Sequence, residues 1–273
     1  MIPVAFDYKR AGSADEAIAL LAEYGDEAKL LAGGHSLLPL MKLRLATPSV
    51  LVDVGRLSDL SYIRDGGDHI AIGALTRHRD VETSSMLAEQ CALLAHTAGT
   101  VGDNQVRHRG TIGGSVAHAD PASDLPATLL ALGATFVAKG PGGERAIPAT
   151  DFFKGFLESD LAADELLTEI RVPKVAGAGW GYQKFNRRAQ DWAIVGCSVI
   201  RNGTTGVALV NMGSTPVRAT AVEQALAQGA SAKDAAELAA DGTEPPSDLN
   251  ASPEYRRHLA KVLVRRALEA AGV

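Results

Sequence analysis

The chain contains little cysteine, and this shortage limits the metal centres that it can hold. Only two cysteines occur in 273 residues, Cys91 and Cys197, far apart and each in an apolar segment. Ordinary iron–sulfur clusters and structural zinc sites need four protein ligands. The seven histidines show no H-E-x-x-H or comparable spacing. We therefore predict two buried, reduced thiols and no metal on this chain.

Basic runs and long apolar runs are also missing. The net charge of -5 and the pI of about 5.8 argue against nucleic acid or an anionic membrane as the main partner. No segment reaches the roughly 18 to 20 apolar residues that span a bilayer, and the N-terminus does not resemble a signal peptide. A hydrophobic fraction of 46% is typical of a globular protein with a packed core. We expect a cytoplasmic protein without a membrane span.

Two common nucleotide-binding motifs are absent. The chain has no G-x-G-x-x-G after a predicted strand and no G-x-x-x-x-G-K-[ST]. Neither a Rossmann site nor a P-loop is therefore indicated. If a dinucleotide binds, another fold must hold it.

Hydrophobic periodicity predicts helices near both ends of the chain. Ser13 and Glu16 form a capping box, apolar residues follow at helical spacing, and Gly25 supplies a stop. At the other end, helices are predicted at 220–228 and 253–271.

Apolar runs bounded by turn residues predict the strands. In the first two thirds of the chain these runs lie at 29–32, 50–54, 70–74, 134–139 and 166–172. In the last third they lie at 181–185, 193–201 and 206–212. Asn202-Gly203 predicts a hairpin between the last two strands. The mixture of helices and strands indicates an α+β fold.

The segment between these elements is predicted to be largely irregular. Thr76 can cap a short helix, and residues 88–98 have the pattern of a single helix. From Val101 to Ser123 the sequence is rich in Gly, Asp, His and Ser and has little periodicity. An ordered loop of this length is usually functional.

A domain boundary is predicted near residue 175. Pro173 and the Gly/Ala stretch at 176–179 interrupt the apolar pattern at that point. The chain would then divide into residues 1–175 and a smaller unit of residues 176–273.

Two glycine-rich loops are the candidate ligand sites. The first reads LLAGGHSLLP at 30–39, and the second reads RGTIGGS at 109–115. Without Cβ atoms, backbone can approach a ligand closely and direct N–H groups at an anion such as a diphosphate. A lone Gly-Gly pair is more often only a turn. Two chemically similar loops in one chain favour a binding site.

Four segments together resemble a known family, the FAD-binding medium subunits of molybdenum hydroxylases, whose relatives include the flavin domain of xanthine dehydrogenase. They are AGGHSLLPLMKLR at 32–44, QVRHRGTIGGSVAHADPASDLPA at 105–127, ELLTEIRVP at 165–173 and KFNRRAQDWAIVG at 184–196. The resemblance covers nearly the whole chain. It implies a two-lobed FAD domain of the vanillyl-alcohol-oxidase type at 1–175, followed by a smaller α+β domain with an antiparallel sheet at 176–273.

The resemblance assigns particular residues to the cofactor. Around the diphosphate it places Ala32, Gly33, Gly34, His35, Ser36 and Leu37 on one side, and Thr111, Gly114 and Ser115 on the other. Near the adenosine or the flavin it places Asp124, Leu161, Lys184, Val101, Gly102 and Trp192. A branched side chain at Gly33 or Gly114 is therefore expected to abolish flavin retention.

Four of these assignments have alternatives. Relatives commonly carry Asn at the position of Ser115, so this contact departs from the family pattern. Asp124 can instead cap a helix, since aspartate favours that position. Lys184 can be a surface lysine on a strand, and Trp192 can be an ordinary core residue.

The resemblance also implies a function. Non-covalent FAD would accept electrons from two [2Fe–2S] clusters on a small partner subunit. A large partner subunit with the molybdenum cofactor would oxidise the substrate. The resemblance also implies that the complex is a dimer of heterotrimers. No residue of this chain is assigned a catalytic role. Asp191-Trp192 is similar to the form seen in aerobic carbon monoxide dehydrogenases, and together with AGGHSLLPLMKLR it favours carbon monoxide, while aldehydes, purines and N-heterocycles such as nicotine stay open as substrates. Quinone, oxygen and NAD stay open as acceptors, with NAD the least favoured because no separate dinucleotide motif is present.

Two other functions are compatible with parts of the sequence. A free-standing FAD-dependent oxidoreductase of the same fold would need its own substrate domain, and the region after residue 175 shows no acid–base cluster. A non-catalytic nucleotide-binding or scaffold module would use the glycines only as turns. A bound yellow chromophore would exclude the second function.

Overall fold

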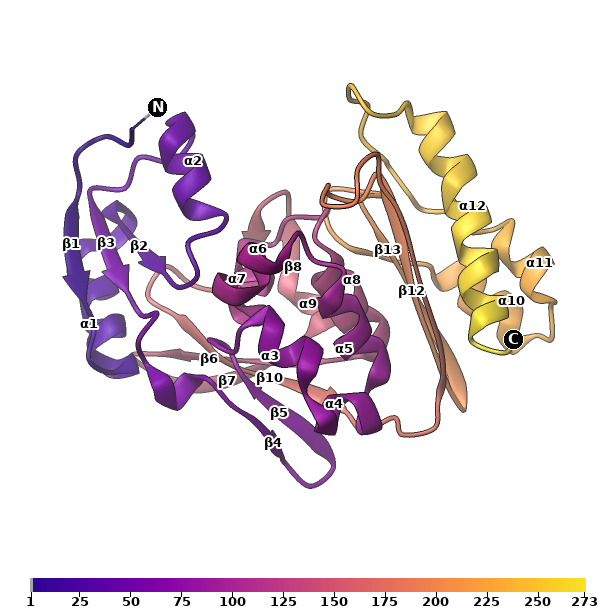
Figure 1. The fold of residues 1–273 in the computed structure, drawn as a ribbon, viewed down its shortest axis with the longest axis horizontal. Coiled ribbons are helices and arrows are strands. Elements are labelled where there is room, and N and C mark those ends of the chain that lie inside the picture. Colours follow the sequence, from indigo (N-terminus) through magenta and orange to yellow (C-terminus); the bar gives the residue numbers. More distant parts are fainter. Residues whose placement is uncertain (1) are drawn as a thin grey trace.

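The computed structural model describes residues 2–273 and contains three main β-sheets that follow one another across the molecule (Figure 1). The N-terminal sheet lies at one end, a central sheet is covered by helices, and a C-terminal sheet is backed by the last helix. The α+β class is confirmed. Within residues 2–273, no helix is long and apolar enough to cross a membrane.

The N-terminal unit is a small parallel sheet covered by one helix. Its strands are β1 (Asp7–Arg10), β2 (Ala28–Leu31) and β3 (Val50–Asp53), paired in the order β1-β3-β2. Its helices are α1 (Ala14–Tyr24), the 3-10 turn η1 (Gly25–Glu27), α2 (Leu37–Leu43) and the 3-10 turn η2 (Ser58–Leu60). Ala17, Ile18 and Leu21 of α1 are buried against this sheet. The loop between β2 and α2 carries the first glycine pair.

Both ends of α1 lie where the sequence predicted, with one change in detail. The Oγ atom of Ser13 accepts a hydrogen bond from the N–H of Glu16 at 3.1 Å. The Glu16 carboxylate accepts from the N–H of Gly12 at 2.7 Å, one residue earlier than in a standard capping box. Gly25 ends the helix with φ of 53°, a left-handed value that glycine adopts at little cost.

The central unit is a five-stranded antiparallel sheet with helices on one face. Its strands, in the order in which they pair, are β4 (Ile63–Asp65), β5 (His69–Gly73), β10 (Leu166–Pro173), β6 (Thr135–Gly140) and β7 (Gly143–Pro148). Its helices are α3 (His78–Thr83), α4 (Ser85–Gln90), α5 (Ala92–Gly99), α6 (Asn104–Arg109), α7 (Ile112–His118), α8 (Asp124–Leu132) and α9 (Ala149–Phe152). A hairpin of β8 (Phe153–Gly155) and β9 (Glu158–Ser159) completes the unit. Ile72, Phe136 and Ile170 form part of its core.

The C-terminal unit is a four-stranded antiparallel sheet packed between helices. Its strands are β11 (Gly179–Phe185), β12 (Val195–Asn202), β13 (Thr204–Val210) and β14 (Val217–Arg218), and its helices are α10 (Thr220–Ala227), α11 (Ala232–Ala236) and α12 (Pro253–Ala270). The predicted hairpin at Asn202-Gly203 is confirmed, with Gly203 at φ of 74°. A Cβ atom at Gly181 would overlap the carbonyl of Ala267 in α12, and one at Gly206 would overlap the carbonyl of Ala131 in α8. Glycines thus let helices approach closely on both faces of the sheet.

Three predictions for residues 76–123 are wrong. The Thr76 hydroxyl does not cap a helix but bonds to the backbone of Tyr62, and α3 starts after Arg77. The helix predicted at 88–98 is divided into α4 and α5 at Cys91, whose φ of -156° and ψ of 59° are not helical.

The third error concerns the long loop predicted from Val101 to Ser123, which contains α6 and α7. Asp103 caps α6 by accepting from the N–H of Val106, and Thr111 caps α7 by accepting from the N–H of Gly114. These caps offset the low helix propensity of the Gly- and His-rich segment. Both helices are too short to produce clear hydrophobic periodicity.

Candidate cofactor site

One cavity of about 670 Å³ lies between the N-terminal unit, the helices of the central unit and the end of β11. Every residue that the resemblance assigned to the cofactor lines it: Ala32, Gly33, Gly34, His35, Ser36, Leu37, Val101, Gly102, Thr111, Gly114, Ser115, Asp124, Leu161, Lys184 and Trp192. Ligand pockets are commonly about 300 to 1,000 Å³, so the space suits a large cofactor. The structure therefore brings these separate segments to one place.

The two glycine loops touch each other at the wall of this cavity. A Cβ atom at Gly33 would overlap the carbonyl of Arg109 and would lie 2.8 Å from the Cα of Gly110. Gly34 has φ of 75°, a left-handed conformation that side chains disfavour. Gly33 is thus needed for packing between the loops. A side chain there would disturb the contact between the loops as well as the binding of a ligand.

The first loop presents main-chain donors that have no protein partner. Within residues 2–273, the N–H groups of His35, Ser36 and Leu37 form no hydrogen bond. The first hydrogen bond at the start of α2 is donated by the N–H of Leu38 to the carbonyl of Gly34 at 3.1 Å. Nδ1 of His35 lies 3.0 Å from the carbonyl of Gly33 and folds the imidazole back on the loop. A row of free N–H groups of this kind can bind an anion.

The second loop uses most of its main-chain donors internally. The N–H of Ile112 donates to the carbonyl of Thr76 at 3.0 Å, and the N–H of Gly113 donates to the carbonyl of Ala74 at 2.9 Å. The N–H of Gly114 donates to Oγ1 of Thr111 at 3.1 Å. The sequence had indicated similar main-chain sites in both loops. In the structure the second loop offers chiefly the hydroxyl groups of Thr111 and Ser115.

Val101 and Gly102 form a tight turn at the edge of the cavity. Gly102 has φ of 49°, and a Cβ atom there would lie 3.0 Å from Val106. The guanidinium of Arg107 donates to the carbonyl of Val101 at 3.0 Å and pairs with Glu82 at 3.0 Å. This ion pair fixes the turn from behind.

Asp124 and Lys184 form a buried ion pair. Nζ of Lys184 lies 2.7 Å from Oδ2 of Asp124, and the side chains are 9% and 6% exposed. The hydroxyl of Tyr182 donates to Oδ1 of Asp124 at 2.6 Å, and Nζ of Lys184 also donates to the carbonyl of Thr100 at 3.1 Å. Burial raises the pKa of the Asp124 carboxyl, while Lys184 and the Tyr182 hydrogen bond lower it.

This pair decides between two of the alternatives. Lys184 is not a surface lysine, since its side chain is enclosed. Asp124 does not act as a helix cap, because Ser123 holds the N-cap position of α8 and the carboxylate binds side chains instead. Each carboxylate oxygen can accept a further hydrogen bond, which leaves Asp124 able to meet a hydroxyl in the cavity.

Leu161 and Trp192 complete the lining from two loops. Leu161 is partly buried and packs against the central core. Trp192 is 56% exposed, so it is not a core residue. Its neighbour Asp191 pairs with Arg188 at 3.0 Å, which ties the loop between β11 and β12 to itself.

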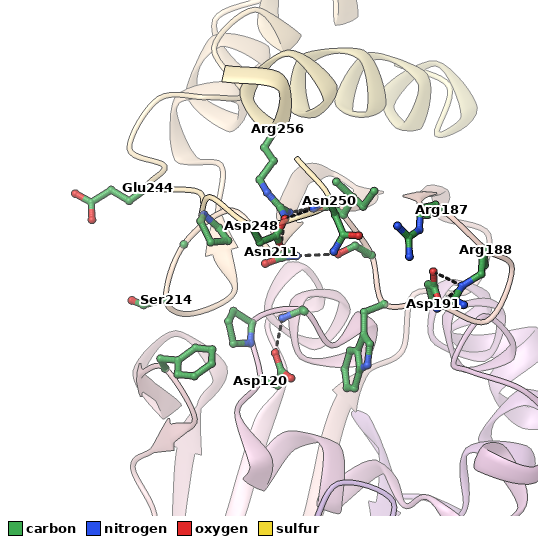
Figure 2. A pocket seen from close by; sticks show the side chains of 18 residues that line it. Asp120, Arg187, Arg188, Asp191, Asn211, Ser214, Glu244, Asp248, Asn250 and Arg256 are labelled. Carbon is green, nitrogen blue, oxygen red and sulfur yellow. Dashed lines mark hydrogen bonds and ion pairs between the residues drawn. The ribbon is translucent and has the colours of Figure 1, made fainter. Parts of the chain in front are cut away.

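A second cavity of about 650 Å³ adjoins the first, and both are lined by Asp191 and Trp192. Figure 2 shows its polar side chains, with Arg256 reaching from α12 to Asp248, and Asp120 on the opposite wall. Nη2 of Arg256 lies 2.7 Å from Oδ2 of Asp248. No motif in the sequence indicates this cavity, because its residues come from several segments far apart in the chain.

Sequence reasoning also missed His78, which lines the first cavity and is 5% exposed. Its Nδ1 atom is enclosed and has no hydrogen-bond partner in the described chain. Burial, followed by the charges of His35, Arg77 and Arg107, lowers the pKa of His78 to about 4. A lone histidine in a helix start carries no distinctive pattern, so only the fold reveals its place.

The two cysteines are buried and free, as predicted. Burial raises the pKa of the Cys91 thiol to about 12 and raises that of Cys197 further. Among residues 2–273, no group of three or more His, Cys, Asp or Glu side chains is arranged to hold a metal ion.

The cavity fits a dinucleotide on three structural grounds. The first loop lines the cavity and keeps N–H groups without a protein partner, the contact at Gly33 leaves backbone rather than side chains at the wall, and His78 adds a polar ring to the lining. Hydroxyl groups and a buried ion pair lie farther along the same cavity. These donors and acceptors match the phosphate, ribose and ring groups of such a ligand.

Comparison with known proteins gives the same result. The family model described as the FAD binding domain in molybdopterin dehydrogenase matches residues 4–175, and the CO dehydrogenase flavoprotein C-terminal domain matches residues 180–271. The chain is 43% identical to the carbon monoxide dehydrogenase medium chain of Hydrogenophaga pseudoflava, over 99% of this chain and 98% of the relative. It is 38% identical to subunit alpha of the 6-hydroxypseudooxynicotine dehydrogenase complex of Paenarthrobacter nicotinovorans, over 98% of this chain and 95% of the relative.

A solved structure shows the same fold. The carbon monoxide dehydrogenase from Hydrogenophaga pseudoflava that lacks the Mo-pyranopterin moiety of the molybdenum cofactor matches with a TM-score of 0.96 and 44% identity. The match covers 100% of this chain and 99% of that one. The chain therefore belongs to the family of FAD-binding medium subunits of molybdopterin dehydrogenases.

Proposed function

We propose that this chain is the FAD-carrying medium subunit of a molybdenum hydroxylase complex, which relays electrons from [2Fe–2S] clusters on a small partner subunit to an external acceptor. The observation that carries this proposal is the cavity in which both glycine loops and all four family segments meet. FAD, when bound, supplies the redox chemistry, and the protein supplies position and electrostatics.

The residues of the chain divide the binding of FAD between them. The free N–H groups of His35, Ser36 and Leu37 would hold the diphosphate, with the hydroxyls of Thr111 and Ser115 on the opposite side. Neutral N–H donors bind an anion without placing a buried countercharge beside it.

The remaining contacts orient the two ends of the cofactor. The pair of Asp124 and Lys184 would meet the sugar or ring polar groups, since both keep hydrogen-bonding capacity in the cavity. Val101 and Gly102 would lie near the isoalloxazine, while Leu161 and Trp192 would cover apolar ring surface. Shielding of this kind limits the access of water to a bound flavin.

Three finer points belong to this proposal. The N-terminal residues 1–175 would form a two-lobed FAD domain of the vanillyl-alcohol-oxidase type, and residues 176–273 a smaller domain that helps to cover the flavin. The complex would be a dimer of heterotrimers with a large molybdenum subunit. We also propose a cytoplasmic location, since the net charge of -5 argues against an anionic membrane surface as the main partner.

Carbon monoxide is the substrate we propose for the complex. The support is the 43% identity to a carbon monoxide dehydrogenase medium chain, together with Asp191-Trp192. A relative named for 6-hydroxypseudooxynicotine is 38% identical over nearly the same length. Substrate selectivity would therefore be set mainly by the large subunit, outside this chain.

Native mass spectrometry of the tagged chain, purified gently from its own host, tests this function. We expect the mass of FAD together with a small and a large partner subunit. A chain that carries FAD but no partners would favour a free-standing FAD-dependent oxidoreductase. A chain without FAD, even after incubation with the cofactor, would contradict the proposal.

A further inference from the structure

His78 lies beside the point where the two glycine loops meet. It is the first residue of α3, and its N–H donates to the carbonyl of Gly110 at 3.0 Å. A Cβ atom at Gly110 would lie 2.7 Å from Cδ2 and 2.8 Å from Nε2 of the imidazole. Gly110 in turn packs against Gly33. The ring of His78 therefore packs against the second glycine loop at the residue that contacts the first loop.

The two ring nitrogens of His78 differ in their surroundings. Nδ1 is fully enclosed and has no partner within residues 2–273. Nε2 also lacks a hydrogen bond to these residues, but it is not fully enclosed, and His78 lines the cofactor cavity. Nε2 is thus the nitrogen that an occupant of the cavity can reach.

This difference fixes the tautomer. A neutral imidazole carries one proton, on either nitrogen. An enclosed N–H without an acceptor is rarer in proteins than an enclosed acceptor without a donor. The proton therefore belongs on Nε2, which makes His78 a hydrogen-bond donor directed at the cavity.

Nearby charges favour a neutral ring. Burial is the main reason that the pKa of His78 falls to about 4, and Arg77 and Arg107 add to the effect. Arg77 donates to the carbonyl of Arg109, and Arg107 pairs with Glu82 at 3.0 Å, so both guanidinium groups have partners other than His78. The ring therefore offers an N–H without a positive charge of its own.

We propose that His78 binds the cofactor directly, with its Nε2–H donating a hydrogen bond to an oxygen of the FAD diphosphate beside the two glycine loops. This assignment rests on the proposed function. It adds a side-chain donor from α3, outside both glycine loops.

The test compares two substitutions of similar length. His78→Gln keeps an N–H donor near the position of Nε2, whereas His78→Met fills the space without a donor. The apo full-length chain is titrated calorimetrically with FAD and, separately, with ADP, which carries the diphosphate without the flavin. The control is His96→Met. The ring centroid of His96 lies 5.0 Å from that of Trp180, and His96 does not line the cavity.

We expect His78→Met to weaken the binding of FAD and ADP about tenfold or more, as for the loss of a hydrogen bond to a charged group. His78→Gln should retain affinity within about threefold, and His96→Met should match the wild type. Unchanged ADP affinity in His78→Met would overturn the assignment, as would an equal loss in both His78 variants. A wild-type chain that binds neither FAD nor ADP would overturn the proposed function itself.

Discussion

Replacing Lys184 by methionine removes the charge that faces the buried carboxylate of Asp124. Methionine has a similar length, so the main loss is the ammonium 2.7 Å from Oδ2. The hydroxyl of Tyr182 would remain as a donor at 2.6 Å. Breaking a buried ion pair costs about 3 to 5 kcal/mol, because the other charge stays buried. With Tyr182 in place, we expect a loss of about 3 kcal/mol in the free energy of unfolding.

A second lysine offers a matched control. Lys174 pairs with Asp65 at 2.6 Å, but the side chains are 27% and 62% exposed. An exposed pair contributes about 0 to 1 kcal/mol, so Lys174→Met should change stability little. Urea unfolding followed by circular dichroism measures both variants. The midpoint should fall clearly only for Lys184→Met, and the denaturant slope should stay constant.

The loss should also depend on pH. Burial holds the pKa of Asp124 above the usual value of 3.8, and removal of Lys184 raises it further, because Lys184 lowers it in the wild type. In the window above 3.8 the folded variant then binds more protons than the unfolded chain, so stability falls as pH rises. The deficit of Lys184→Met should therefore shrink in acid. A deficit equal to that of Lys174→Met at neutral pH, or one independent of pH, would refute the reasoning.

Three further predictions concern other buried groups. The pKa of His78 is about 4 in the folded chain against 6.5 in an ordinary histidine, so up to about 3 kcal/mol of stability should be present above pH 6.5 and lost as pH falls toward 4. Urea unfolding measured across this range should show a smaller dependence of stability on pH for His78→Met than for the wild type. An equal dependence in both proteins would contradict this prediction. Cys91 and Cys197 should react with Ellman's reagent only after unfolding, because burial keeps both thiols protonated; modification of the native chain at neutral pH would be evidence against this. Gly33→Ala should lower the melting temperature by several degrees through collision with the second loop, whereas Gly142→Ala, with nothing within 4 Å, should not; equal melting temperatures would show that the loops can separate freely.

Local signals in the sequence located much of the fold. The cap at Ser13, the stop at Gly25 and the hairpin at Asn202-Gly203 are each set by backbone conformation within a few residues. Such signals do not depend on distant contacts, so they can be recognised in a single sequence. The same local chemistry at Asp103 and Thr111 was overlooked, because the helices that they begin are too short to show periodicity.

The contacts within the site, by contrast, could not be predicted from the sequence. The sequence, through its resemblance to a family, indicated residues that all line one cavity. It could not show that Gly33 touches Gly110, that Asp124 meets Lys184, or that the ring of His78 supports the second loop. These contacts join residues far apart in the chain and leave no pattern of spacing. They are visible only once the sheets have brought the loops together.

The most direct test of the central claim is the FAD content of the purified chain and of Gly114→Val. A Cβ atom at Gly114 would lie 2.7 Å from Oγ1 of Thr111, the hydroxyl that caps α7, and the next atom is 4.0 Å away, so the variant should fold with at most the loss of that cap. Flavin released from each protein is quantified by chromatography, and the melting temperature is measured beside it. We predict about one FAD per wild-type chain and a strong loss in Gly114→Val at a similar melting temperature. Equal FAD in both proteins, or none in the wild type, would contradict the account.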